Sequence, residues 1–139
     1  MPSYGRTDVA FVRGDGVYLY TQDDKQYLDF GAGIAVTALG HSHPHLVAAL
    51  HEQTGRLWHT SNLYHIPQQQ RLADRLVSNS FADTVFFCNS GAEAVEASIK
   101  LIRKYHSTKG HSERYRLISF EGSFHGRTLA TIAAGANEA

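Results

Sequence analysis

Two short motifs carry residue types that bind phosphate and carboxylate groups. In the first, an apolar run at 85–88 precedes Ser90 and Gly91, and apolar residues with helical spacing follow. This order directs backbone N–H groups beyond the end of a predicted strand, where the partial positive charge of a helix N-terminus favours a phosphate. In the second motif, Phe124 and Arg127 supply an aromatic face and a fixed cation. Together the two motifs predict half of a cofactor site.

The first motif has a second interpretation, as a helix cap that binds nothing. Residues 90–93 read Ser-Gly-Ala-Glu, which is a capping box. In it the Ser90 hydroxyl accepts a hydrogen bond from the N–H of Glu93, and the Glu93 side chain accepts one from the N–H of Ser90. Gly91 favours the binding interpretation, because a residue without Cβ lets a ligand approach the backbone closely. The turn by itself leaves both interpretations open.

The elements that must position these residues begin with a β segment and continue with helices. Residues 9–30 alternate apolar and polar positions around Gly-Asp-Gly and Asp-Asp turns, which indicates short antiparallel strands. Helical patterns then start at Pro44 and at Pro67, where proline suits the first turn. A third helix is predicted from Gly91 to about Tyr105.

Two apolar runs, at 84–88 and 115–120, are predicted as strands. Strands that alternate with helices of this length imply a parallel α/β sheet. Cys88, the one cysteine of the chain, lies inside the first run and is expected to be a buried core residue rather than a reactive thiol. On the helix between the runs, Glu96 and Lys100 are expected to form an exposed i, i+4 pair.

The composition excludes several classes of protein. Because 13 basic residues balance 13 acidic ones, no nucleic-acid partner is expected. The sequence has no apolar run near the length of a membrane span and no secretory signal, so we expect no membrane partner and a cytoplasmic location.

Alternating histidines suggest a different chemistry. His41, His43 and His45 would lie on one face of a regular strand and there hold zinc or nickel. However, Pro44 breaks the regularity, and no cysteine or carboxylate within the cluster offers a fourth ligand. A loop role is the better interpretation, and we predict no metal site.

Four separated motifs together resemble the class III, or ornithine-type, aminotransferases. They read LDFGAGIAVTALGHSHPHL, SNLYHIPQQ, FCNSGAEAVEASIK and SFHGRTLATIA, and they occur in the family's order. The second motif is most similar to members that act on N2-acetylornithine. The resemblance implies the N-terminal part of a pyridoxal phosphate-dependent transferase of fold type I: a short β segment, then the start of a mostly parallel sheet flanked by helices. Residues 1–43 would belong to the small domain and 44–139 to the beginning of the large, cofactor-binding domain.

The resemblance also implies roles for individual residues. The N–H groups of Gly91 and Ala92, with the Ser90 hydroxyl, would hold the cofactor phosphate. Phe124 would stack on the pyridine ring, and His125 would pack near the cofactor. Arg127 would bind the substrate carboxylate, since its planar fork makes two parallel hydrogen bonds. Without the resemblance, Phe124 reads as a core aromatic and Arg127 as a surface residue.

The expected reaction moves an amino group between N2-acetylornithine, or an ornithine-like amine, and 2-oxoglutarate in arginine biosynthesis. Alternatives are a 4-aminobutyrate or ornithine aminotransferase, a decarboxylase or an aminomutase of the same family, or a non-catalytic phosphate-binding module. By comparison with the family, the Schiff-base lysine is none of the chain's four lysines, so the chain is expected to be an inactive fragment of a homodimeric enzyme. The lysines are Lys25, Lys100, Lys104 and Lys109.

Overall fold

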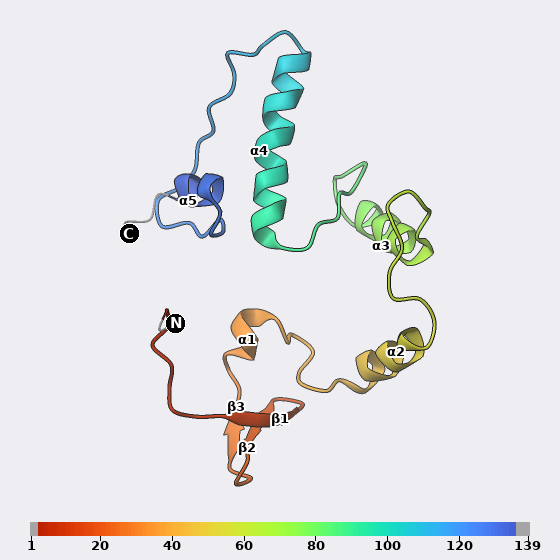
Figure 1. The fold of residues 1–139 in the computed structure, drawn as a ribbon, viewed down its shortest axis with the longest axis vertical. Coiled ribbons are helices and arrows are strands. Elements are labelled where there is room, and N and C mark those ends of the chain that lie inside the picture. The colour runs from red at the N-terminus through yellow and green to blue at the C-terminus, as the bar shows by residue number, and fades with distance from the viewer. Residues whose placement is uncertain (1–2, 136–139) are drawn as a thin grey trace. The chain divides into compact units, whose positions relative to one another are not determined.

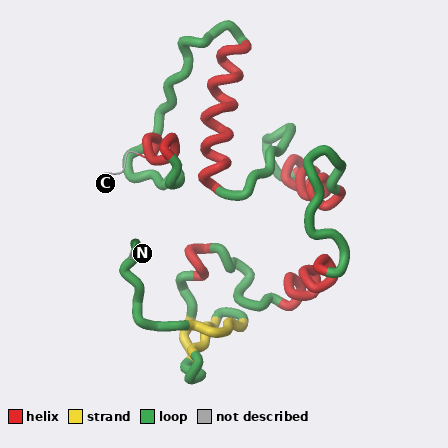
Figure 2. Tube along the Cα trace, viewed as in Figure 1, coloured by secondary structure: helices red, strands yellow, loops and turns green. Residues whose placement is uncertain are grey.

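The computed structural model describes residues 3–135 (Figures 1 and 2). These residues divide into two units at 66/67. Each unit has its own internal contacts and is described by itself. The first contains every strand of the described residues and two helices, and the second contains three helices. The domain boundary expected at 43/44 stays a prediction.

The first unit begins with an antiparallel sheet in the order β1-β2-β3, as the alternating pattern predicts. Strands β1 (Phe11–Asp15) and β2 (Tyr18–Thr21) form a hairpin, and β3 (Gln26–Leu28) pairs with the other edge of β2. The two turns contain residues with positive φ, at Gly16 and Asp24, which are the residue types that adopt this conformation most readily.

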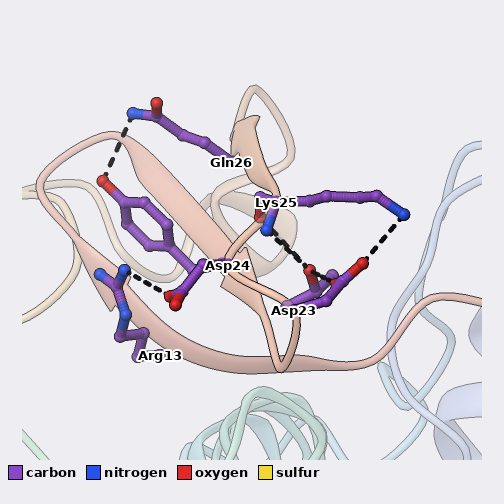
Figure 3. Close-up of polar contacts among 7 residues, drawn as sticks. Arg13, Asp23, Asp24, Lys25 and Gln26 are labelled. Atoms are coloured by element: carbon purple, nitrogen blue, oxygen red, sulfur yellow. Dashed lines mark hydrogen bonds and ion pairs between the residues drawn. The ribbon is translucent and has the colours of Figure 1, made fainter.

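Polar side chains link the strands to the turn between β2 and β3 (Figure 3). Arg13 donates to Asp24 over 3.1 Å, and its guanidinium carbon lies 3.6 Å from the centre of the Tyr20 ring. At the turn itself, Lys25 pairs with Asp23 at 2.9 Å. These groups are exposed, so each ion pair adds little to the stability of the sheet.

A left-handed turn follows the sheet in α1 (Ala32–Ala35). All four of its residues have positive φ, including the β-branched Ile34 at 62°. Such residues cost about 1–2 kcal/mol each. The Asp29 carboxylate offsets part of this cost, because its Oδ1 accepts hydrogen bonds from the N–H groups of Gly31 and Ala32, both over 2.9 Å.

The first unit ends with helix α2 (Pro44–Thr54) and the segment after it, and α2 begins at the proline that predicted it. Proline is suited to this position because its missing N–H would have no helical partner in the first turn. Helix α3 (Pro67–Ser78) opens the second unit, again at the predicted proline.

Helices α4 (Gly91–Thr108) and α5 (Leu129–Gly135) pack against each other in the second unit, and α4 continues one turn beyond the expected end at Tyr105. Ile99 of α4 and Thr131 of α5 are two of the three buried residues in the described part of the chain. The third is Gly135.

The predicted strands at 84–88 and 115–120 are wrong for this structure, in which neither segment has regular secondary structure. A parallel strand needs ladder partners and covered faces. These segments instead expose Phe86 by 75% and Ile118 by 98%, and the one sheet of the described residues is antiparallel. Cys88 is likewise exposed, so its expected place in a core is also wrong for this structure.

Candidate functional site

Helix α4 begins with the predicted cap, with one difference. Ser90 is extended, with φ −155° and ψ 162°, and its hydroxyl accepts a hydrogen bond from the N–H of Glu93 over 3.2 Å. The Glu93 carboxylate accepts from the N–H of Asn89 over 2.5 Å, not from that of Ser90 as expected. The Asn89 side-chain amide also points to Glu93, at 3.4 Å, so both donors of Asn89 converge on this carboxylate.

The cap leaves part of the helix N-terminus available. Glu93 and Ala94 both direct their N–H groups to Ser90, whereas the N–H groups of Gly91 and Ala92 have no hydrogen-bond partner within residues 3–135. A Cβ added to Gly91 would meet no atom within 4 Å, so the backbone is open on that side. An α-helix presents such unpaired N–H groups at its positive end, and an anion is stabilised there. The two interpretations of the motif are therefore compatible, because the capping box uses other donors.

The Phe-His-Gly-Arg loop lies against the first turn of α4. A Cβ on Gly126 would stand 2.7 Å from the Cβ of Ala92 and 2.9 Å from the hydroxyl of Thr131. Gly126 also has φ +129°, a backbone conformation that favours glycine. Steric fit and backbone conformation both require glycine here, and this contact brings the second motif to the end of the helix where Gly91 and Ala92 lie.

The aromatic ring of Phe124 is 71% exposed, so the core alternative for this residue does not hold in the structure. The guanidinium carbon of Arg127 lies 5.7 Å from the centre of the Phe124 ring. His125, which lies between these two residues in the sequence, is half-buried. A flat aromatic face and a cation thus lie together beside the α4 N-terminus. The roles of these residues in holding a cofactor or a substrate stay predictions.

Glu96 is a residue whose contact the sequence reasoning missed. It accepts a hydrogen bond from the hydroxyl of Thr128 over 2.5 Å and does not form the expected pair with Lys100 in the described residues. Ala92 and Glu96 are four residues apart and lie on one face of α4, which is the face that contacts the loop. The spacing of four residues could have indicated from sequence that Ala92 and Glu96 share a face. It could not have indicated that Thr128 contacts that face.

The histidine cluster has a structural role at His41. Its Nε2 lies 2.7 Å from Oδ2 of Asp29, and its backbone exchanges hydrogen bonds of 2.7 and 3.0 Å with Gly16. The hydrogen bond with His41, followed by that from the N–H of Ala32, lowers the pKa of the Asp29 carboxyl. Within residues 3–135 no group of three metal-ligating side chains occurs.

Comparison with known proteins identifies the family. The aminotransferase class-III family matches residues 2–139. The chain belongs to the class III aminotransferases. This family is pyridoxal phosphate-dependent.

The chain is similar to several acetylornithine aminotransferases. It is 63% identical to that of Mesorhizobium japonicum over 133 residues, which are 96% of this chain and 33% of the relative. It is 58% identical to that of Rhodobacter capsulatus over 138 residues, which are 99% of this chain and 35% of the relative. The class III chain therefore spans about a third of the length of the curated relatives it matches.

Solved structures confirm the fold class. The N-acetylornithine aminotransferase from Stenotrophomonas maltophilia K279a is 46% identical and has a TM-score of 0.79, over 87% of this chain and 34% of its own. An omega-aminotransferase from Paracoccus denitrificans has a TM-score of 0.85 at 26% identity, over 95% of this chain and 30% of its own. The class III chain thus has the fold of the N-terminal part of fold type I transferases. None of the helices at 3–135 has the length and apolar character needed to cross a membrane.

Proposed function

We propose that this chain is the N-terminal part of an aminotransferase that moves an amino group between N2-acetylornithine and 2-oxoglutarate, in arginine biosynthesis. The observation that carries the proposal is the contact between Gly126 and Ala92, because it places the Phe124–Arg127 loop beside the open N–H groups of α4. The sequence identity of 63% to an acetylornithine aminotransferase supports this amino donor over other amines.

The residues present fit pyridoxal phosphate. The N–H groups of Gly91 and Ala92 would bind its phosphate, and the Ser90 hydroxyl, which already accepts from Glu93, can donate its own hydrogen to the same group. Phe124 would orient the pyridine ring and exclude water from its face, with His125 beside it. When bound, the cofactor supplies an electron sink for the carbanion that forms on the substrate.

Arg127 would bind a substrate carboxylate. Its guanidinium offers two parallel N–H donors, which fix the orientation of an acid as well as its charge. A carboxylate held in this way would fix the orientation of the substrate, and that orientation would decide which of its bonds reacts. This role for Arg127 is compatible with amino transfer.

Other parts of the reaction require groups outside the chain described here. None of its four lysines lies in the α4 N-terminal turn or the Phe124–Arg127 loop, so the lysine that carries the cofactor is expected elsewhere in the enzyme. We propose that the 139-residue chain alone is inactive and that the complete enzyme is a cytoplasmic homodimer that acts on small amino and oxo acids.

An assay of the complete enzyme tests the proposal. Purified enzyme with N2-acetylornithine and 2-oxoglutarate should form glutamate, lose this activity when the cofactor is removed and regain it when pyridoxal phosphate is added. 4-Aminobutyrate and ornithine serve as competing donors. Carbon dioxide release without amino transfer, or a clear preference for 4-aminobutyrate, would contradict the proposal.

A further inference from the structure

Glu96 has the position of a residue that holds the substrate-binding loop in place. It lies on the same face of α4 as Ala92, one helical turn away. Ala92 contacts the loop at Gly126, and Glu96 contacts it at Thr128. Arg127 is the residue between these two contacts, so its backbone is held on both sides.

The hydrogen bond between Thr128 and Glu96 belongs to a larger network that includes Thr131. The Thr128 hydroxyl donates to Oε1 of Glu96, and the Thr128 N–H donates to the hydroxyl of Thr131 over 2.9 Å. Thr131 is fully buried, and its own hydroxyl hydrogen can go to Thr128, whose carbonyl oxygen lies at 3.1 Å and hydroxyl oxygen at 2.9 Å. A hydrogen bond to a carboxylate is shorter and about twice as strong as one between neutral groups. Thr128 is thus fixed to α4 by Glu96 and to α5 by Thr131.

We propose that Glu96 is a positioning residue that, through Thr128, sets the place of Arg127 relative to the α4 N-terminus. This inference rests on the proposed function. An arginine that binds a substrate carboxylate must lie at a fixed distance from the cofactor, because a misplacement of about 1 Å can cost roughly a hundredfold in rate. Glu96 supplies a fixed point on α4 one turn from the helix N-terminus that would bind the cofactor phosphate. It does not itself touch the substrate.

The test uses the complete enzyme with Glu96→Ala, Thr128→Val and the double variant. Each single variant removes the same hydrogen bond, so each should raise the KM for 2-oxoglutarate by about tenfold, with a smaller change in kcat. The double variant should be about as impaired as either single variant, because two changes to one contact are not additive. Hydrogen exchange at the amides of 126–128 should also become faster in Glu96→Ala.

Conservative variants and a matched control separate positioning from general stability. Glu96→Gln keeps an oxygen acceptor and Thr128→Ser keeps the hydroxyl, so both should stay near the wild-type KM. Glu121→Ala removes an exposed carboxylate from the segment that precedes the loop and should leave KM unchanged.

Two results would overturn the inference. One is a Glu96→Ala enzyme with lowered thermal stability but wild-type KM and wild-type exchange at 126–128. The other is an additive effect in the double variant, since it would show that the two side chains act independently. Failure of the proposed function is a different result, in which the wild-type enzyme transfers no amino group, and the exchange measurement still decides the role of Glu96.

Discussion

Arg127 lies between two contacts of its loop with α4, and its guanidinium carbon is 5.7 Å from the Phe124 ring. In the complete enzyme, Arg127→Ala should lower kcat/KM for 2-oxoglutarate by an amount equivalent to about 2–5 kcal/mol, if the charge pair is desolvated. Arg127→Lys should recover part of this loss, because it keeps the charge but not the planar fork. Steady-state kinetics would show this, with Arg116→Ala as an exposed arginine control. Unchanged kinetics in Arg127→Ala would exclude the clamp.

Phe124 is exposed and lies two residues before Gly126, which approaches α4 at Ala92. Replacement by alanine should weaken the binding of pyridoxal phosphate, because the flat surface that would orient the pyridine ring is lost. Phe124→Tyr keeps that surface and should bind almost normally. Titration of the cofactor by absorbance measures the dissociation constants. Phe120→Ala removes another exposed ring and is the control. Full affinity in Phe124→Ala would argue against stacking.

Asp29 stabilises the first unit in a pH-dependent way. Its pKa is lowered in the folded chain, chiefly by the hydrogen bond with His41. A lowered folded-state pKa means that the stabilisation is fully present above the unfolded pKa of about 4 and is lost as pH falls through the folded value.

Asp29→Asn should therefore unfold at a lower temperature than wild type at neutral pH, and the difference should shrink below about pH 4. Thermal unfolding followed by circular dichroism from neutral to acidic pH measures this difference. Asp8→Asn changes an exposed aspartate of the same unit and is the control. A difference that does not depend on pH would contradict the assignment to the Asp29 carboxylate.

At the scale of the element, the cap of α4 determines where the helix begins. Ser90→Ala removes the acceptor for the N–H of Glu93 and should lower the free energy of unfolding by about 1 kcal/mol. Ser98→Ala is a matched control on the same helix. Its hydroxyl donates to the carbonyl of Ala94, which already belongs to the helix ladder, so replacement should be neutral or slightly stabilising. Urea unfolding compares the two, and equal effects would contradict the capping role.

The start of each long helix could be predicted because its signal is local. Pro44 and Pro67 begin α2 and α3, and Ser90 caps α4, where the predictions placed them. The apolar runs at 84–88 and 115–120 could not be assigned in the same way. A strand at these positions would need hydrogen-bond partners and covering helices that are distant in sequence. An apolar run indicates only a preference for burial.

At the scale of the whole molecule, the described residues bury few side chains. Fully exposed apolar residues such as Phe81, Ile118 and Leu129 occur in the second unit, and Phe30 and Ile34 in the first. Exposed apolar surface favours association with other chains. The 139-residue chain on its own should therefore self-associate. Sedimentation velocity at increasing concentration should show growing species, and a compact monomer at all concentrations would contradict this prediction.

Some residues of the candidate site could be predicted from their neighbours in the sequence, and others could not. Ser90, Gly91 and Ala92 could be proposed from sequence because a cap and a helix start depend on adjacent residues. Phe124 and Arg127 required the family resemblance, and Glu96 was assigned to a contact with Lys100 that does not form. Only the fold shows that Glu96 meets Thr128, a residue 32 positions later.

By itself, the sequence determined the family, the places where the long helices begin and the capping turn at Ser90, because each of these can be recognised from short stretches of the chain. The tertiary structure decided which separate segments meet, namely Gly126 with Ala92 and Thr128 with Glu96. It also decided that Cys88 is exposed. The physical reason is that such contacts depend on the packing of elements, and packing is set by shape and burial rather than by distance along the chain.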